Sequence, residues 1–171
     1  MTGLFIRTYG DSILRKKAST VPKVTSETRE LVSQMLDIMY KNKGVGLAAP
    51  QVGISERIVV VDIGEGPLAI INPEIVSKEG EDVGDEGCLS IPEITVEIKR
   101  AQKILVTSLN TYGKTIKVKA INLMARALQH EIDHLNGTLI IDYADIRKRQ
   151  MINGKLKKLK RQTLHGLKAY Q

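Results

Sequence analysis

The sequence predicts an α+β fold in which antiparallel or mixed β-sheets pack around a central helix. Short β-branched runs follow one another along the middle of the chain, at residues 58–63, 68–71, 74–77, 95–98, 103–109 and 115–121. Helical patterns lie on either side of these runs and not between them. Successive parallel strands need a long crossover, usually a helix, so strands that arrive consecutively favour an α+β fold over a doubly wound one.

The first predicted helix covers residues 26–41, where Leu31, Met35 and Met39 fall on one face. Gly44 then breaks this spacing and begins a loop. Among the strands, the composition of residues 110–113 (Asn-Thr-Tyr-Gly) predicts a hairpin turn. The hairpin would join the last two β-branched runs.

The central helix is predicted to begin at Asn122 as its N-cap and to stop at Asn136-Gly137. Apolar residues between these limits give it a flank that can pack in a core. A further helix is predicted over residues 150–168, with leucines on one side and lysines elsewhere. Asn153-Gly154 weakens the start of that helix.

The charge of the chain divides it into a body, residues 1–146, and a basic helical extension, residues 147–171, of the same domain. Residues 146–171 contain nine Lys or Arg and no Asp or Glu, which leaves 17 basic and 19 acidic groups in the rest of the chain. Only the extension is therefore expected to attract an anionic partner.

The composition also indicates a cytoplasmic protein. No apolar run approaches the length of a membrane span, and the N-terminus lacks the pattern of a secretory signal. The single cysteine cannot form an internal disulfide and suits a reducing compartment.

The segment His130-Glu131-Ile132-Asp133-His134 carries the clearest chemistry. Histidines four residues apart share a helix face, so both imidazoles can reach one divalent ion. The intervening glutamate can take a proton from water on that ion. The alternative is a surface helix with incidental histidines. The motif predicts a metal hydrolase built on the central helix.

A catalytic ion of this kind needs a third protein ligand. Metzincin peptidases place a histidine six positions after the second one, but Ile140 occupies that position here. Thermolysin-like peptidases use a later glutamate, and no Glu follows Glu131. Asp142 and Asp145 would have to fold back to reach the ion. Cys88, the sole cysteine, is the better candidate, although a lone cysteine is often only a small buried hydrophobe.

Three segments together resemble the short bacterial form of peptide deformylase. They are residues 44–51 (Gly-Val-Gly-Leu-Ala-Ala-Pro-Gln), 86–90 (Glu-Gly-Cys-Leu-Ser) and the histidine motif, in the order and approximate spacing of that family. The resemblance implies a hydrolase that removes the formyl group from the N-terminal methionine of nascent polypeptides. It also implies one divalent ion, usually iron(II), although zinc, nickel or cobalt can take its place.

The resemblance further implies the roles of individual residues. Cys88, His130 and His134 would hold the ion, and Glu131 would act as the general base. The Gln51 side chain and the Leu89 backbone N–H would stabilise the oxyanion. The implied substrate-binding residues are Val45, Gly46, Gly87, Leu123 and Ala127. The first three would hold the peptide as an added strand, and Val45, Leu123 and Ala127 would line the methionine pocket.

Three neighbouring positions lead to less definite expectations. The stem of Arg126 could line the methionine pocket while its charge reaches solvent or Asp133. Asp133 could itself pair with Arg100 or orient a ligand, or it could be a plain surface charge. Some family members have an arginine where this chain has Thr95, so contacts with the distal part of the peptide are in doubt.

Two other functions remain possible from the sequence. A zinc endopeptidase of another class would cut internal peptide bonds and use a third ligand other than Cys88. If the chain is a ribosome- or RNA-binding module, the basic tail at 147–168 is its main functional element. The tail and the active site could also cooperate, with the tail holding a deformylase near ribosomal RNA. Alternatively, the tail is a solvated helix whose leucines cover the body.

Overall fold

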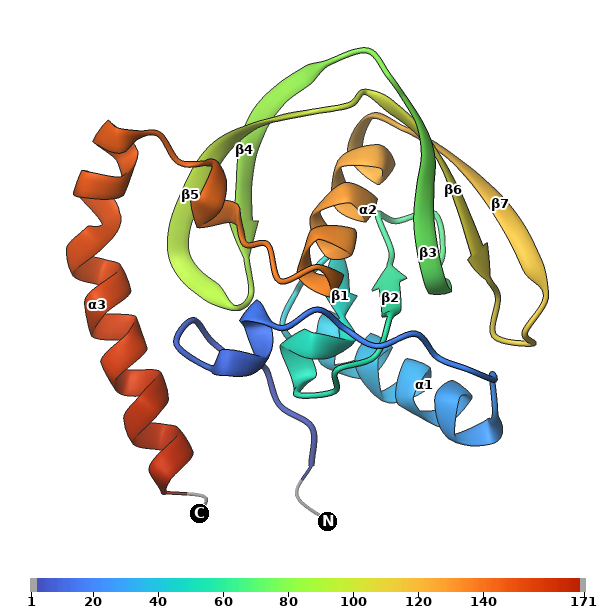
Figure 1. The fold of residues 1–171 in the computed structure, drawn as a ribbon, viewed down its shortest axis with the longest axis horizontal. Helices are drawn as coiled ribbons and strands as arrows, with labels where there is room; N and C mark the ends of the chain where they lie inside the picture. The colour runs from blue at the N-terminus through green and yellow to red at the C-terminus, as the bar shows by residue number, and fades with distance from the viewer. Residues whose placement is uncertain (1–2, 170–171) are drawn as a thin grey trace.

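A computed structural model describes residues 3–169 of the chain (Figure 1). Residues 1–2, at the start of the predicted body, and residues 170–171, at the end of the predicted extension, lie outside the described part. The helix α2, Asn122–Leu135, occupies the centre of the molecule, and strands surround it on several sides. Its backbone lies close to strands of the larger of two sheets. The predicted arrangement of sheets around a central helix is confirmed.

The larger sheet has five antiparallel strands in the order β1-β2-β3-β6-β7. Their bounds are β1 Gly46–Ala48, β2 Ile58–Val61, β3 Leu68–Glu79, β6 Lys103–Leu109 and β7 Thr115–Ile121. The two runs predicted at 68–71 and 74–77 therefore form one strand. The gap between them remains visible as a shift in register between Ile71 and Glu74, where Asn72 has a φ of 52°.

Both faces of this sheet are covered, as the alternating side chains of β2 show. Val59 and Val61 belong to the core cluster that includes Leu128 and Ile132 of α2. Ile58 and Val60 belong to the opposite cluster, which includes Met35 and Met39 of α1, Ser26–Lys41. Successive side chains of a strand point to opposite faces, so one strand anchors two helices. A continuous β-branched run is the expected sequence of such a doubly buried strand.

The smaller sheet is a hairpin of β4, Asp82–Cys88, and β5, Ile91–Arg100. Along β5 buried and exposed residues alternate, so the strand is longer than the predicted run at 95–98. Within the described residues β4 pairs with β5 alone. One edge of β4 is therefore left without a strand partner.

Helix α1 begins where predicted, because Thr25 and Thr28 form a capping box at its N-terminus. The prediction that Asn122 caps α2 is wrong by one residue. The N-cap is Ile121, which offers no side-chain acceptor, and the Asn122 N–H instead donates to the Gln102 carbonyl. Short 3-10 helices complete the fold at η1 Ser12–Arg15, η2 Ala49–Val52 and η3 Ile140–Tyr143.

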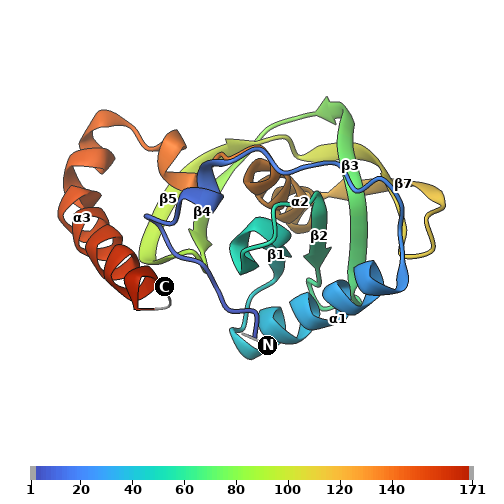
Figure 2. The same ribbon diagram turned by 60° about the horizontal axis from the view of Figure 1, so that its bottom comes forward.

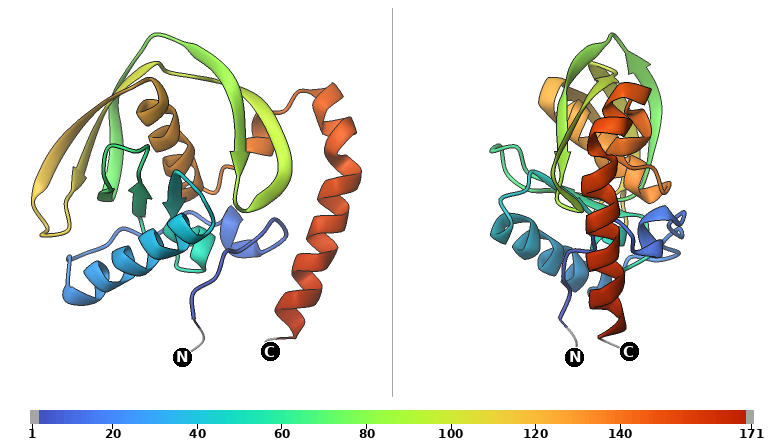
Figure 3. Two further views of the ribbon diagram at one scale, coloured as in Figure 1. Left: turned by 180° about the vertical axis from the view of Figure 1, so that it is seen from behind. Right: turned by 90° about the vertical axis from the view of Figure 1, so that its left-hand side faces the viewer.

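Helix α3, Ile146–Lys168, begins four residues before the predicted start, since the Asp145 side chain accepts a hydrogen bond from the Lys148 N–H. It runs along the outside of the β4–β5 hairpin, and Figures 2 and 3 show it beside the N-terminal segment. Ile152 is buried against the hairpin, and Thr8 Oγ1 and Thr163 Oγ1 are 2.6 Å apart. No helix within residues 3–169 is both long and apolar enough to cross a membrane.

Candidate active site

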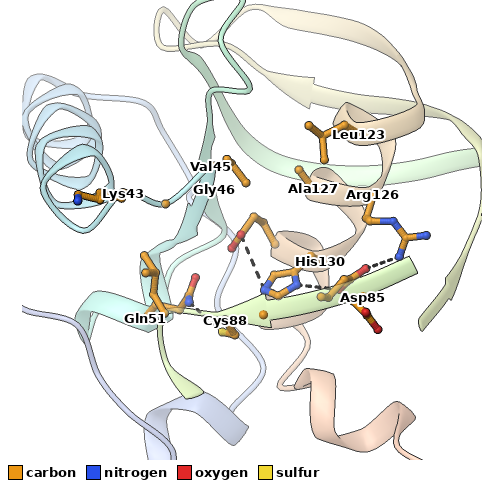
Figure 4. Close-up of a pocket in the computed structure, with 15 residues that line it drawn as sticks. Lys43, Val45, Gly46, Gln51, Asp85, Cys88, Leu123, Arg126, Ala127 and His130 are labelled. Atoms are coloured by element: carbon orange, nitrogen blue, oxygen red, sulfur yellow. Dashed lines mark hydrogen bonds and ion pairs between the residues drawn. The ribbon is translucent and has the colours of Figure 1, made fainter. Parts of the chain in front are cut away.

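A cavity of about 390 Å³ lies between β1, β4 and α2 (Figure 4). Its walls are formed by the start of β1 and the residues just before it, by the free-edge strand β4 and by one side of α2. Of the eleven residues predicted for the site, ten line this cavity, and only His134 does not. The ten are Val45, Gly46, Gln51, Gly87, Cys88, Leu89, Leu123, Ala127, His130 and Glu131.

The three predicted metal ligands are brought together at one end of the cavity. His134 Nε2 is 3.4 Å from Cys88 Sγ and 3.3 Å from His130 Nε2, and all three donor atoms lie within 4.8 Å of one another. A tetrahedral ion at normal bond lengths requires about 3.3 Å between two nitrogens and about 3.6 Å between sulfur and nitrogen. Both separations that involve His134 are therefore close to those that such an ion requires.

One hydrogen bond and one buried imidazole agree with a metal at this position. Glu86 Oε2 lies 2.9 Å from His130 Nδ1, so a proton on Nδ1 leaves the lone pair of Nε2 pointing toward Cys88 and His134. His134 is 1% exposed, and burial lowers the pKa of its imidazole well below the ordinary value. The contact with Glu86 thus orients the His130 ring for coordination through Nε2, whereas His134 Nδ1 is buried with no hydrogen-bond partner among the described residues.

Glu86 is itself held by two arginines. Arg100 Nε and Nη2 donate to its two oxygens at 2.8 and 2.9 Å, and Arg126 Nη1 donates at 2.9 Å. Burial alone would raise the pKa of Glu86, but hydrogen bonds from Arg100 and His130 outweigh it and lower the pKa to about 2. The carboxylate that orients His130 is therefore ionised.

Asp133 extends this network away from the cavity. Its Oδ2 accepts hydrogen bonds from Arg100 Nη1 and from Tyr143 Oη, both at 2.6 Å. The predicted pairing of Asp133 with Arg100 is confirmed, so Asp133 is not a plain surface charge.

Glu131 points into the cavity from the middle of the histidine motif. It is 4% exposed, its Oε1 is 4.0 Å from His130 Nε2, and its Oε2 has no hydrogen-bond partner among the described residues. Burial raises the pKa of Glu131 to about 7. A Cβ at Gly46 would stand 2.5 Å from Oε1, so only glycine leaves room for this carboxylate. The geometry is that of a proton acceptor close to the three predicted ligands.

Gln51 faces the same point from η2. Its Oε1 accepts from the Ala48 N–H at 2.9 Å, which fixes the amide so that Nε2 donates to Ser90 Oγ at 3.1 Å and approaches Cys88 Sγ at 3.6 Å. An N–H donor is therefore fixed beside the predicted ligand Cys88. Leu89 follows Cys88 in the turn between β4 and β5.

Arg126 behaves differently from its prediction. Its side chain lines the cavity as expected, but its charge reaches neither solvent nor Asp133. The guanidinium bonds instead to Glu86, to the carbonyl of Ile98 and to Asp82. Sequence spacing missed the contacts with Glu86 and Asp82 because these residues lie on β4, a strand that had not itself been predicted.

Residues 4–150 match the model of the family described as polypeptide deformylase. The chain belongs to this family. A peptide deformylase from Desulfitobacterium hafniense is 53% identical over 135 residues, which cover 79% of this chain and 90% of that protein. One from Thermotoga maritima is 49% identical over 152 residues, covering 88% of this chain and 93% of the other.

Solved structures of deformylases match the fold. The crystal structure of a peptide deformylase from Legionella pneumophila gives a TM-score of 0.87 at 42% identity, covering 94% of this chain and 97% of that one. The Ehrlichia chaffeensis peptide deformylase in complex with actinonin gives 0.87 at 41% identity, with 92% and 98% covered.

Membership of the deformylase family confirms the predicted fold class and the prediction of an enzyme that removes formyl groups from nascent peptides. The alternative of another zinc endopeptidase is not favoured. The deformylase family is metal-dependent, and the Cys88, His130 and His134 cluster could hold the ion.

Proposed function

We propose that this chain hydrolyses the formamide of N-terminal formyl-methionine with one divalent ion held by Cys88, His130 and His134. The observation that carries the assignment is the spacing of the three donor atoms, with the carboxylate of Glu131 beside them. Iron(II) is the ion proposed for the cell, on the resemblance to the family, and zinc, nickel or cobalt could occupy the same ligands. When bound, the ion would lower the pKa of a water molecule and polarise the formyl carbonyl.

Glu131 is the proposed proton carrier. Its unpartnered Oε2 would accept the proton of the attacking water as the new C–O bond forms. When the C–N bond breaks, the same oxygen would pass that proton to the departing amine. The products are formate and a free N-terminal methionine.

Gln51 and Leu89 are the proposed oxyanion donors. The Gln51 amide is already oriented by the Ala48 N–H, so no reorganisation is needed when charge develops on the formyl oxygen. The backbone N–H of Leu89 would donate to the same oxygen from the turn after Cys88.

The peptide is proposed to bind as an added strand between β1 and the free edge of β4. Backbone groups of Val45, Gly46 and Gly87 would pair with it. The methionine side chain would enter the cavity toward Leu123 and Ala127 of α2, which lie above His130 in Figure 4. Thr95 is exposed and does not line the cavity, so it adds no contact there.

Release of formate from a formyl-methionyl peptide by metal-loaded protein tests this mechanism. Glu131→Gln should retain the ion and lose turnover by about 10²- to 10⁴-fold, because the proton carrier is gone. Cys88→Ala should weaken binding of the ion itself. Activity that survives both substitutions would contradict the proposed site.

The basic extension, residues 147–171, is a second element with a proposed role. Within it α3 packs against the body through Ile152 and Thr163, while most of its lysines and arginines are exposed. We propose that this exposed basic surface, residues 147–168, holds the enzyme near ribosomal RNA. Contacts with phosphates explain such a surface better than solvation alone, because no acidic residue balances it.

The packing of α3 decides how this role should be tested. Deleting the helix would uncover the hairpin, so neutralising Lys157, Lys158 and Arg161 as glutamines is the better experiment. The triple variant should lose ribosome co-sedimentation and show a weaker salt dependence, with formate release from a short peptide unchanged. Equal co-sedimentation at every salt concentration would contradict the docking role. We place the enzyme in the cytoplasm, where nascent chains emerge and a free Cys88 stays reduced.

A further inference from the structure

Arg126 is a buried arginine on α2, one helical turn before His130. It is 9% exposed, although its neighbours on the helix, Ala125 and Ala127, are small and apolar. Burying a guanidinium is costly unless its donors are satisfied. An arginine retained at such a place therefore requires partners of matching geometry.

The partners of Arg126 all belong to the β4–β5 hairpin. Nη1 donates to Glu86 Oε1 at 2.9 Å and to the Ile98 carbonyl at 3.0 Å. Nη2 donates to the carbonyl and to Oδ2 of Asp82, both at 2.8 Å. A Cβ at Gly84 would stand 3.4 Å from Arg126 Cζ, so the β4 backbone lies directly against the guanidinium. One side chain thus bonds to both strands of the hairpin.

These bonds join two elements whose backbones scarcely approach each other. The backbone of α2 lies close to β1, β2, β6 and β7, but makes few close approaches to β4 in the described residues. Two of the proposed ligands, His130 and His134, are on α2, whereas Cys88 ends β4. The separation between helix and strand therefore sets the separation between the nitrogen and sulfur donors.

Arg126 also acts on the carboxylate that orients His130. Glu86 Oε1 receives Arg126 Nη1 and Arg100 Nε, while Oε2 receives Arg100 Nη2 and His130 Nδ1. Arg100 lies on β5 and holds Glu86 within the hairpin, while its Nη1 also bonds to Asp133 of α2 at 2.6 Å. Among the partners of Glu86, only Arg126 and His130 come from α2.

We propose that Arg126 is a positioning residue that clamps the hairpin onto α2 and thereby fixes Cys88 at coordinating distance from His130 and His134. The inference rests on the proposed metal site and adds a residue outside the ligand set. Without the hydrogen bonds of Arg126, β4 can move relative to α2. Binding of the ion then has to order the strand, which lowers the affinity for the ion. Changes to groups that orient ligands typically cost about ten- to hundredfold in metal affinity.

The test compares three variants of the full chain by metal affinity. Arg126→Met keeps the aliphatic stem in the cavity and removes every N–H donor. Arg126→Lys keeps the positive charge but loses the planar guanidinium that donates to several acceptors at once. Arg15→Met is the matched control, because it removes a bidentate pair with Asp142 and a bond to the Gly137 carbonyl at a place outside the cavity. The dissociation constant of Zn²⁺ is measured by competition with a chelator, and thermal unfolding is followed with and without Zn²⁺.

Arg126→Met is expected to bind Zn²⁺ about ten- to hundredfold more weakly, and Arg126→Lys to fall between it and the unaltered chain. Arg15→Met should lower the unfolding temperature both with and without Zn²⁺ and leave the affinity for Zn²⁺ unchanged. Affinity within twofold of the unaltered chain in Arg126→Met, whatever its stability, overturns the proposal. If that variant does not fold, unchanged affinity in Arg126→Lys overturns it instead. Failure of the unaltered chain to bind Zn²⁺ would contradict the metal site itself.

Discussion

Glu86 and His130 are 44 residues apart in the sequence, and Glu86 Oε2 lies 2.9 Å from His130 Nδ1. The same carboxylate receives donors from Arg100 and Arg126, so one buried group connects the hairpin, the central helix and the proposed ligand set. Several measurable properties depend on this group and on its neighbours.

Glu86 should make the fold sensitive to acid. Its pKa of about 2 in the folded protein is below the ordinary value of 4.5, so its ionised form stabilises the native state at pH values above about 4.5. That contribution is lost as the pH falls from about 4.5 toward 2. Urea unfolding at a series of pH values should show the loss, and Glu86→Gln should remove part of the pH dependence in this window. An identical pH dependence in the variant would contradict the prediction.

Gly46→Ala should impair catalysis more than metal binding. The added Cβ would stand 2.5 Å from Glu131 Oε1 and force this proposed proton carrier to move. A displacement of about 1 Å in a catalytic group can reduce turnover by about a hundredfold. Gly154→Ala is the matched control, because nothing lies within 4 Å of the new Cβ on α3. It should leave formate release unchanged and stabilise the fold by about 0.5–1 kcal/mol. Equal activity in the two variants would contradict the close packing of Gly46 on Glu131.

Removal of the ion should expose Cys88 to alkylation. Cys88 is the sole cysteine and is partly exposed beside the cavity, so a thiol reagent reports on one site. The metal-loaded chain should react much more slowly than the chelated chain, since a coordinated thiolate is not free to attack. Equal labelling rates in the two samples would mean that Cys88 is not a ligand. An iron-loaded preparation should also lose activity faster in air than under anaerobic conditions.

Tyr143→Phe should destabilise the network around Arg100. The Tyr143 hydroxyl donates to Asp133 Oδ2 at 2.6 Å, and the Arg100 guanidinium lies 4.8 Å from the ring centroid. Because the ring is partly exposed, the expected loss in the free energy of unfolding is about 1 kcal/mol. Tyr112→Phe, at a side chain that is 78% exposed, should change stability by less than about 0.5 kcal/mol. The Tyr143 hydroxyl also accepts a hydrogen bond from Arg100 Nη1 at 3.2 Å. Urea denaturation compares the two variants, and equal effects would show that the hydroxyl bonds to Asp133 and Arg100 contribute nothing.

The sequence predicted those parts of the fold and site that depend on local patterns. Helix α1 and strands β6 and β7 have the predicted bounds, because helical spacing and β-branched runs report directly on local burial. Strand β4 was missed because Asp82, Gly84 and Gly87 are unusual strand residues, and only pairing with β5 makes the segment extended. The capping of α3 by Asp145 was missed for a different reason, since the predicted start relied on apolar spacing alone.

The predicted site residues lie together, but the groups that support them were found only in three dimensions. A histidine motif and a lone cysteine can be recognised in the sequence alone, because coordination chemistry restricts the residue types. The bonds of Arg126 to Asp82 and Ile98 carry no such signature. A buried arginine can be satisfied by any carbonyl that the fold supplies, so its partners follow from tertiary structure.

The unpaired edge of β4 has a consequence for the range of proteins that one enzyme can process. An open strand edge binds main-chain amides, which every polypeptide carries, whereas a pocket selects a single side chain. If the peptide binds as proposed, the selective pocket would demand methionine at the first position, and the unselective edge would accept varied residues after it. One enzyme could then act on nascent chains of many different sequences.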